Sequence, residues 1–591
     1  MKRRSVLKGL AAIAALPLIA PAQAAPFRRV RPGDAAWPSV QDWEQFKTQL
    51  GGNLLKPTDL FSVCATDTGG ADCTTATREI GNPFFIGDQA GGTQVSGWLN
   101  AWSPKPSAYA VSAHRPEDVV AAVNFARTHR LRLVVKGGGH SYQGTSNAPD
   151  SLLVWTRPMH AITLHDAFVP DGSREAPVPA VTIQAGAMWV DAYDAVTTKA
   201  HRYVQGGGCM TVGVAGLIQS GGFGSFSKRY GTAASNLLQA EVVTADGKLR
   251  IVNARRDADL FWGLKGGGGG SLGVVTKVTL KTHDLPDRFG FVECKITAHS
   301  PEYLRRLLAR FVDFYADNLF NPHWGEGITF GENILDIAMT CQGLTTEEAR
   351  AVWKPFLDWV AQDGAFSASP RISTDNAFSY WDVQAMRKSG SHAVMFDDRP
   401  GSSPAHGWWN GDEEQVGMFL HGYDSLWLPK SLLDSGARAE LARALFDASR
   451  EMVVRLHFNK GLAGGTPAAI AAARDTATNP KVIDAFCLAI IATGGGARYP
   501  GLKPPDEAAK AASDAKGVDR ATAILRAIAP DAGSYVSESN FFNANWRQEF
   551  WGGNYARLAG VKAKYDPDGL FTVHHGVGSE AWSEDGFTRR A

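Results

Sequence analysis

The chain has little net charge and few cysteines, and it lacks long apolar runs beyond its start. Its 591 residues carry 60 Lys and Arg against 59 Asp and Glu, a net charge of +1. There is no basic stripe and no acidic tail, which argues against nucleic acid as a partner. After the first 25 residues no run approaches the ~18 apolar residues of a membrane span. Nothing in the sequence indicates an oligomeric state.

The six cysteines are dispersed and form no C-x-x-C pair or Cys/His cluster, so we expect no metal site. Cys64 and Cys73 lie in a loop rich in Gly, Thr and Asp. For these two, a short disulfide and a pair of free thiols both remain open. Cys294 and Cys487 lie in apolar, strand-like stretches and are expected to be buried thiols.

Glycine, in contrast, is abundant, with 63 residues gathered into runs and not repeated every third position, which excludes collagen. Consecutive glycines let backbone N–H groups turn inward and bind an anion. The run 266–270 forms part of a G-x-G-x-x-G match that ends at Gly273. A β-branched strand follows it, where a dinucleotide fingerprint requires a helix, and this excludes a Rossmann fold.

The first 24 residues are typical of an export signal. Lys2, Arg3 and Arg4 form a charged start, an apolar run covers 10–20, and Ala22-Gln23-Ala24 is a small-residue cleavage site. The paired arginines resemble a twin-arginine signal; an ordinary secretory signal is the alternative. We therefore expect a bacterial exported protein, periplasmic or secreted.

Two reactive side chains each follow three glycines. His140 lies in V-K-G-G-G-H-S-Y-Q-G and Cys209 in G-G-G-C-M-T-V-G-V-A-G. The simplest interpretations are a surface histidine and a small buried thiol. The first segment, however, resembles R-S-G-G-H-S-Y-E-G of the berberine-bridge-enzyme-like FAD-linked oxidases, a branch of the vanillyl-alcohol-oxidase superfamily with a PCMH-type FAD-binding domain. The second resembles G-x-C-P-T-V-G-V-G-G of the same family.

A third match lies near the C-terminus. Residues 550–578, F-W-G-G-N-Y-A-R-L-A-G-V-K-A-K-Y-D-P-D-G-L-F and onward, resemble the closing motif of that family. The resemblance implies an α+β fold. It consists of a two-part FAD-binding domain at 101–286, a substrate domain of antiparallel sheet backed by helices at 287–534, and a segment at 535–591 that completes the FAD domain. Residues 25–100 would be an N-terminal extension.

The resemblance also implies FAD held by two covalent bonds, an 8α-histidyl bond at His140 and a 6-S-cysteinyl bond at Cys209. Leu217 departs from the family pattern because many members carry a histidine there. Asn554 is expected near the flavin ring. The residues expected to bind the cofactor are Gly137, Gly138, Gly139, His140, Ser141, Gly144, Cys209, Thr211, Val212, Gly213, Gly216, Gly222, Gly273, Val275, Asn554 and His575.

The resemblance implies hydride transfer from a hydroxyl-bearing small molecule, but the base is less clear. Relatives carry Y-x-N-Y, and Glu538 occupies the place of the catalytic tyrosine. Partial burial would raise the pKa of Glu538 towards neutral, or nearby cations would lower that of Tyr535. Glu538 is preferred, and a structural role for both is the alternative. Val212 lies three residues after the cysteine, where the resemblance implies control of O2 access: members that react fast with O2 tend to have a small residue or Val there.

We therefore expect an oxidase that makes hydrogen peroxide. The substrate class is a sugar or oligosaccharide, or a phenolic or other secondary metabolite, with Trp408, Trp409 and Trp427 available for stacking. A dehydrogenase that reduces a periplasmic quinone or cytochrome is one alternative. A flavin-bearing binding protein without turnover is another.

Overall fold

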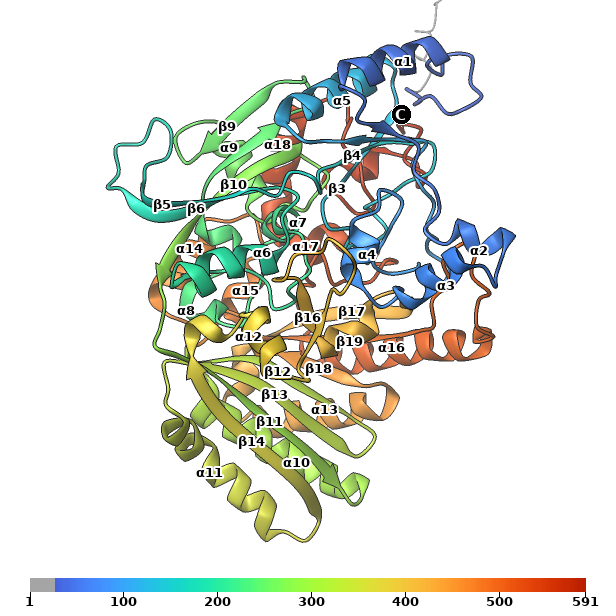
Figure 1. Ribbon diagram of the computed structural model, residues 1–591. Coiled ribbons are helices and arrows are strands. Elements are labelled where there is room, and N and C mark those ends of the chain that lie inside the picture. The colour runs from blue at the N-terminus through green and yellow to red at the C-terminus, as the bar shows by residue number, and fades with distance from the viewer. Residues whose placement is uncertain (1–26, 591) are drawn as a thin grey trace, which may run out of the picture.

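The computed structural model describes residues 27–590, so the expected export signal at 1–24 lies outside the described residues. Figure 1 shows two halves, an upper one built mainly from the first 284 residues and a lower one built around a large antiparallel sheet. The C-terminal helices return to the upper half. This is the α+β architecture that the sequence predicts.

The first sheet has four strands in the order β1-β2-β4-β3. The pairs β2–β4 and β3–β4 are parallel, and β1 pairs antiparallel with β2. Helices α1 and α5 cover it, with Phe46 stacked on Phe125 at 4.1 Å between ring centroids. Because α1 and β1 are integral to this layer, part of the expected N-terminal extension belongs to the FAD-binding half. The bounds are α1 (Val40–Gln49), β1 (Leu54–Leu55), β2 (Tyr109–Ser112), α5 (Pro116–Thr128), β3 (Arg132–Lys136) and β4 (Ser151–Trp155).

The second sheet is antiparallel, in the order β5-β6-β10-β8-β9, and β7 also pairs with β10. Strand β10 begins one residue after Gly273. The glycine run therefore enters a strand, as expected, and not the helix of a Rossmann fold. The bounds are β5 (Ile162–Phe168), β6 (Val178–Gln184), α6 (Trp189–Tyr193), β7 (Arg202–Val204), α7 (Val214–Gln219), α8 (Ser227–Tyr230), β8 (Leu237–Val243), β9 (Leu249–Asn253), α9 (Ala258–Leu264) and β10 (Val274–Asp284).

The third sheet has seven antiparallel strands in the order β14-β11-β13-β12-β18-β19-β17. Its first strand, β11, begins at Arg288, so the chain crosses between halves close to the expected boundary. One face packs on four long helices to form a core. The bounds are β11 (Arg288–Ala298), α10 (Pro301–Phe314), β12 (Trp324–Gly331), β13 (Ile334–Gln342), α11 (Thr346–Gln362), β14 (Phe366–Asn376), β17 (Phe419–Pro429), α13 (Arg438–Glu451), β18 (Val454–His457), α14 (Pro467–Arg474), α15 (Lys481–Asp484), β19 (Ala485–Gly495) and α16 (Ala508–Ile528).

The C-terminal segment, with α17 (Trp546–Trp551) and α18 (Tyr555–Tyr565), returns to the upper half. The ammonium of buried Lys562 fixes it there by donating to the carbonyl oxygen of Ser271 at 2.7 Å and to Asp566 at 2.6 Å. Phe571 forms a parallel bridge with Leu133 of β3. The C-terminal segment therefore packs against the sheets of the upper half, which earlier parts of the chain form.

A segment that we call the strap, residues 389–415, crosses from the lower half to the upper half. It follows α12 (Val383–Lys388) and contains a short hairpin, β15 (Val394–Phe396) and β16 (Gly407–Trp409). His406 of the strap contacts Asp191 of α6 at 3.2 Å, and Arg399 contacts Asp88 at 2.7 Å. These contacts hold the strap against the FAD-binding half.

Three short helices near the N-terminus, α2 (Ser62–Thr66), α3 (Ala71–Arg78) and α4 (Pro83–Gly87), contain the one disulfide of the described residues. It joins Cys64 to Cys73, which decides between the two alternatives that the sequence left open. Cys294 and Cys487 are buried thiols, as predicted. Within residues 27–590 no helix is both long and apolar enough to cross a membrane.

Candidate active site

One large cavity lies between the two halves, with a volume of about 1790 Å³. Glycine-rich loops of the upper half form one wall, and strands of the seven-stranded sheet and the strap form the other. Drug-sized ligands occupy pockets of roughly 300–1,000 Å³. The cavity therefore has room for a large cofactor together with a substrate.

The loops that bear the two reactive residues pack directly against each other. A Cβ atom placed on Gly138 would lie 3.1 Å from the backbone nitrogen of Gly213, and one on Gly213 would lie 3.0 Å from that of Gly138. Any side chain at either position would push the loops apart. This contact directs His140 and Cys209, which follow different glycine runs, into the same cavity.

The His140 imidazole is held in a neutral state. The side-chain amide of Gln94 donates a hydrogen bond to its Nε2 atom at 2.6 Å. Burial lowers the pKa of His140 to about 4, because the charged imidazolium would lose its water. A neutral ring keeps the nitrogen lone pair that a covalent bond to carbon requires.

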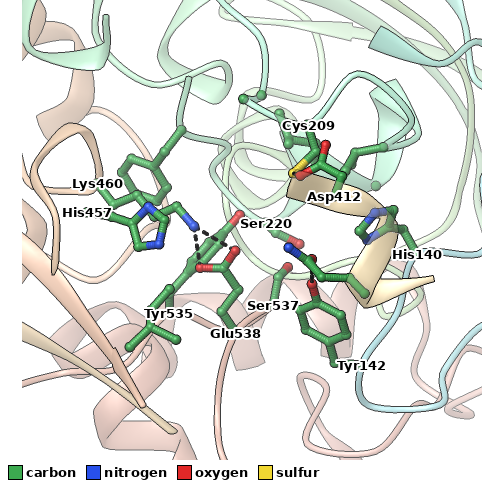
Figure 2. A pocket seen from close by; sticks show the side chains of 18 of the residues that line it. His140, Tyr142, Cys209, Ser220, Asp412, His457, Lys460, Tyr535, Ser537 and Glu538 are labelled. Atoms are coloured by element: carbon green, nitrogen blue, oxygen red, sulfur yellow. Dashed lines mark hydrogen bonds and ion pairs between the residues drawn. The ribbon is translucent and has the colours of Figure 1, made fainter. Parts of the chain in front are cut away.

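The Cys209 thiol faces a carboxyl group from the strap. Its sulfur donates to Oδ1 of Asp412 at 3.3 Å. Burial, followed by the negative charge of Asp412, raises the pKa of the thiol well above its usual value. Burial likewise raises the pKa of Asp412, to about 6. Figure 2 shows this pair on the same side of the cavity as His140.

Glu538 lies on the opposite side of the cavity, next to a lysine (Figure 2). The Lys460 ammonium donates to both carboxylate oxygens, at 2.7 and 2.6 Å. This geometry stabilises the carboxylate. Glu538 is partly buried, as the sequence interpretation assumed, but the structure also gives it a counter-ion that this interpretation did not include.

Tyr535 shares a turn with this glutamate, since the backbone N–H of Glu538 donates to the carbonyl oxygen of Tyr535 at 2.8 Å. Burial, and then the charge of Glu538, raise the pKa of the Tyr535 phenol. The condition under which Tyr535 would act as a base, a phenol acidified by cations, is not met. The phenol is a poor proton acceptor in this setting.

A second carboxyl group, that of Glu326, comes from the third residue of β12 in the cavity wall. Glu326 has a positive φ of 56°, which is costly for a non-glycine residue and clusters at functional sites. Ser225 donates to its Oε1 at 2.5 Å, and Asn459 approaches the same oxygen at 3.5 Å. Burial raises the pKa of Glu326. The sequence contained no local sign of this residue.

Most residues predicted to act at the site line the cavity. Those that do are Gly137, Gly138, Gly139, His140, Ser141, Cys209, Val212, Gly213, Gly216, Gly273, Val275, Tyr535, Glu538 and His575. His575 stacks on Trp546 with 5.3 Å between ring centroids, and burial lowers its pKa to about 3.

Four predicted residues do not line it, and their contacts give the reason. The Asn554 amide donates to the carbonyl oxygen of Thr478 at 2.9 Å and so ties the C-terminal segment to the lower half. Asn554 therefore does not line the cavity, and its place near the ring stays a prediction. The other three support the loops: Gly144 packs on Trp102, Gly222 packs on Leu217, and Thr211 is buried under Gly138.

The three tryptophans expected to stack on substrate have different environments. Trp408 and Trp427 are buried core residues, 3% and 2% exposed, and the indole N–H of Trp427 donates to the carbonyl oxygen of Lys460. Neither lines the cavity. Trp409 does, with its indole N–H donating to the carbonyl oxygen of Gly208 at 3.1 Å. Of these three tryptophans, only Trp409 is placed to contact a ligand in the cavity.

The glycine wall fits a dinucleotide cofactor. Cβ atoms placed on Gly216 and Gly269 would meet no atom within 4 Å, so bare backbone faces open space there. Several buried polar side-chain atoms have no partner among the described residues, and those that belong to residues lining the cavity include Gln219 Oε1, Asp412 Oδ2 and His575 Nδ1. Backbone N–H groups with unpaired polar side chains nearby suit pyrophosphate, ribose and ring heteroatoms.

Comparison with known proteins agrees with this geometry. The FAD-binding-domain family model matches residues 107–253, and the model for berberine and berberine-like proteins matches residues 534–578. The chain therefore contains an FAD-binding domain and a berberine-like C-terminal segment, the two parts that characterise the berberine-bridge-enzyme-like flavoproteins it resembles. It is an FAD-linked oxidoreductase, and the family resemblance predicted from the three motifs is confirmed.

Relatives of this berberine-bridge-enzyme-like chain include the VAO-type flavoprotein oxidase VAO615 of Thermothelomyces thermophilus. That protein is 29% identical, with 95% of this chain and 94% of the relative covered. The FAD-linked oxidoreductase notD' of Aspergillus versicolor is also 29% identical, over 95% of this chain and 90% of its own. These relatives are fungal, so they give no support to the expected bacterial origin.

Solved structures of VAO-type flavoproteins have the same fold. That of MtVAO615 from Myceliophthora thermophila matches with a TM-score of 0.77 and 27% identity, over 95% of this chain and all of that one. A glucooligosaccharide oxidase from Acremonium strictum, described with a 6-S-cysteinyl, 8α-N1-histidyl FAD, matches at 0.63 and 19% identity over 86% and 98%. The second similarity shows the fold alone.

Proposed function

We propose that this family member is an oxidase with FAD bound covalently at both His140 and Cys209. The observation that carries the proposal is that both side chains and Glu538 face one cavity, although they come from three distant parts of the chain. The neutral imidazole of His140 and the thiol of Cys209 supply the two nucleophiles. The glycine wall at 137–139 and 213–216 would hold the cofactor between them.

The chemistry needs a group that removes a proton from the substrate. When bound, FAD accepts a hydride from a substrate carbon and passes the two electrons to an acceptor. Glu538 is the proposed base: its carboxylate accepts the proton of the substrate hydroxyl, and Lys460 orients it through two hydrogen bonds. As the proton arrives, Lys460 stays within reach of the second carboxylate oxygen and keeps the acid in place.

The proposed electron acceptor is O2, which would leave as hydrogen peroxide. Val212 supports this because its small side chain lines the cavity at the loop that bears Cys209. A periplasmic quinone or cytochrome is the competing acceptor. Rapid anaerobic reduction of a dye with slow consumption of O2 would favour that alternative.

The proposed substrate is a hydroxyl-bearing organic molecule. Away from the glycine wall the cavity is lined by Glu293, Asp336, Arg371 and Arg455, charged groups that favour a polar, hydroxyl-rich ligand such as an oligosaccharide. A phenolic or other secondary metabolite is the second class. A panel of both, scored by anaerobic bleaching of the flavin absorbance, separates them. A protein that no member bleaches would be a flavin-bearing binding protein.

The proposal of two anchors is tested by acid precipitation of the purified protein, followed by peptide mass mapping. Flavin should remain in the pellet of wild type, His140→Ala and Cys209→Ala, and be lost only from the double variant. Cys294→Ala with His165→Ala is the matched control, because neither residue lines the cavity. A colourless wild-type pellet would refute covalent attachment.

Export by the segment at residues 1–24 is also part of the proposal. Those residues lie outside the described part of the chain. N-terminal sequencing of the secreted protein should begin near residue 25, and an intact N-terminus in the cytoplasmic fraction alone would contradict export.

A further inference from the structure

Cys209 and Asp412 are brought together from opposite halves of the molecule. The cysteine follows the glycine run 206–208 of the upper half, and the aspartate belongs to the strap. Their side chains meet through one hydrogen bond of 3.3 Å at the cavity wall. The other oxygen of Asp412, Oδ2, is buried and has no partner among the described residues.

Two further contacts hold Asp412 at this place. On one side of it, the indole N–H of Trp409 donates to the carbonyl oxygen of Gly208, the residue directly before Cys209. On the other side, Gln415 accepts a hydrogen bond at 2.7 Å from the hydroxyl of Tyr142, which lies two residues after His140. The strap therefore contacts both anchor-bearing loops, with Asp412 between the two contacts.

The thiol requires help to react. Its pKa is raised by burial and by Asp412, so at neutral pH the sulfur carries its proton. Among the described residues, Asp412 is the one group that accepts a hydrogen bond from the thiol. The pKa of Asp412, about 6, leaves it mostly ionised at neutral pH and close to the value at which a base is most effective.

We propose that Asp412 is the base that removes the thiol proton of Cys209 while the sulfur bonds to the flavin ring. The inference rests on the proposed bicovalent attachment. In the net change the S–H bond and the C–H bond at ring carbon C6 break, and a C–S bond forms. The thiol proton goes to Asp412 and the ring proton to water. Two electrons pass through the ring to O2, which with two protons becomes hydrogen peroxide.

Asp412 thus takes part in completing the holoenzyme, apart from any role in turnover. Asp412→Asn keeps the shape of the side chain and removes the base. We expect the initial rate of Cys209 attachment in aerated protein to fall at least ~100-fold, as is typical for loss of a general base. Attachment at His140 should be unchanged, which shows in the same sample that the variant folds and binds FAD.

The pH profile separates a base from a structural contact. In Asp412→Asn, attachment at Cys209 should accelerate about tenfold for each pH unit between 7 and 9, because the reaction then depends on spontaneous ionisation of the thiol. Wild type, produced under riboflavin limitation and then given FAD, should be nearly independent of pH above 7. A wild-type rate that also rises tenfold per unit would overturn the proposal.

The readout is mass spectrometry of the peptides that contain Cys209 and His140, with and without flavin. Asp412→Glu should retain attachment. Glu326→Gln is the matched control. The Glu326 carboxyl group is close to the loop that bears Cys209, since a Cβ atom placed on Gly208 would lie 3.2 Å from its Oε1. That oxygen, however, accepts a hydrogen bond from Ser225 and not from the thiol. Full Cys209 attachment in Asp412→Asn, or its loss in Glu326→Gln alone, would overturn the inference. A wild type without flavin on Cys209 would remove the bicovalent proposal as well.

Discussion

Replacement of Glu538 by glutamine tests the proposed base most directly. Glutamine keeps the size of the side chain and one oxygen that can accept from Lys460, but it cannot hold a substrate proton. If Glu538 is the base, the rate of anaerobic flavin reduction by substrate should fall by ~10²–10⁴. That is an increase of about 3 to 5 kcal/mol in the activation free energy of this step.

The same substitution affects stability, and the two effects must be measured separately. The Lys460 and Glu538 side chains are 13% and 19% exposed, between a surface pair and a buried one. Exposed pairs contribute ~0–1 kcal/mol and a broken buried pair costs ~3–5 kcal/mol. We therefore expect the free energy of unfolding to drop by about 1–3 kcal/mol. Thermal unfolding of the flavin-loaded variant measures this term.

The assay is stopped-flow absorbance of the flavin with saturating substrate in the absence of O2. Glu326→Gln is the control, since this second carboxyl group faces the same cavity but hydrogen-bonds Ser225 and contacts Asn459. A reduction rate within a few-fold of wild type in Glu538→Gln would exclude Glu538. A larger loss in Glu326→Gln than in Glu538→Gln would transfer the role to Glu326.

Three other changes have defined outcomes. Val212→Ile should slow reoxidation by O2 while substrate reduction is retained; unchanged oxygen kinetics would exclude a gate at this position. Burial alone would lower the pKa of His406, but Asp191 and Asp397 outweigh it and raise the pKa, so its stabilising effect is complete below ~6.5 and disappears as pH rises through the folded-state value. His406→Gln should therefore lower the Tm more at pH 6 than at pH 9, and equal losses would contradict this. Serine at both Cys64 and Cys73 should cost about 2–3 kcal/mol of unfolding free energy if the loop of nine residues opens with the global transition; an unchanged Tm would mean that it opens locally.

The sequence predicts best what local patterns encode. Strand β10 follows Gly273 as its β-branched residues indicate, and His140 and Cys209 are found because glycine triplets precede them. Helix α16 has only a weak apolar pattern, because its apolar positions are mostly alanine and Gly517 interrupts them. The sequence alone does not distinguish a buried tryptophan such as Trp427 from one that stacks on a ligand.

The residues that complete the site are not marked in this way. Gln94 precedes His140 by 46 residues, and Asp412 follows Cys209 by 203. Lys460 precedes Glu538 by 78. Gln94 lies in a loop, and Asp412 and Lys460 lie in short 3₁₀ helices with no motif of their own. Only the tertiary fold brings these pairs into contact, so a single sequence contains no pattern by which they could be recognised.

The division of the site between the two halves has a consequence for its assembly. The glycine loops of the upper half fix each other through the contact of Gly138 with Gly213, independently of the lower half. His140 and its partner Gln94 both belong to this upper part. Cys209, in contrast, finds Asp412 only when the strap is docked. If attachment follows these contacts, the bond at His140 needs the upper half alone, whereas the bond at Cys209 also requires the closed arrangement that brings Glu538 to the cavity.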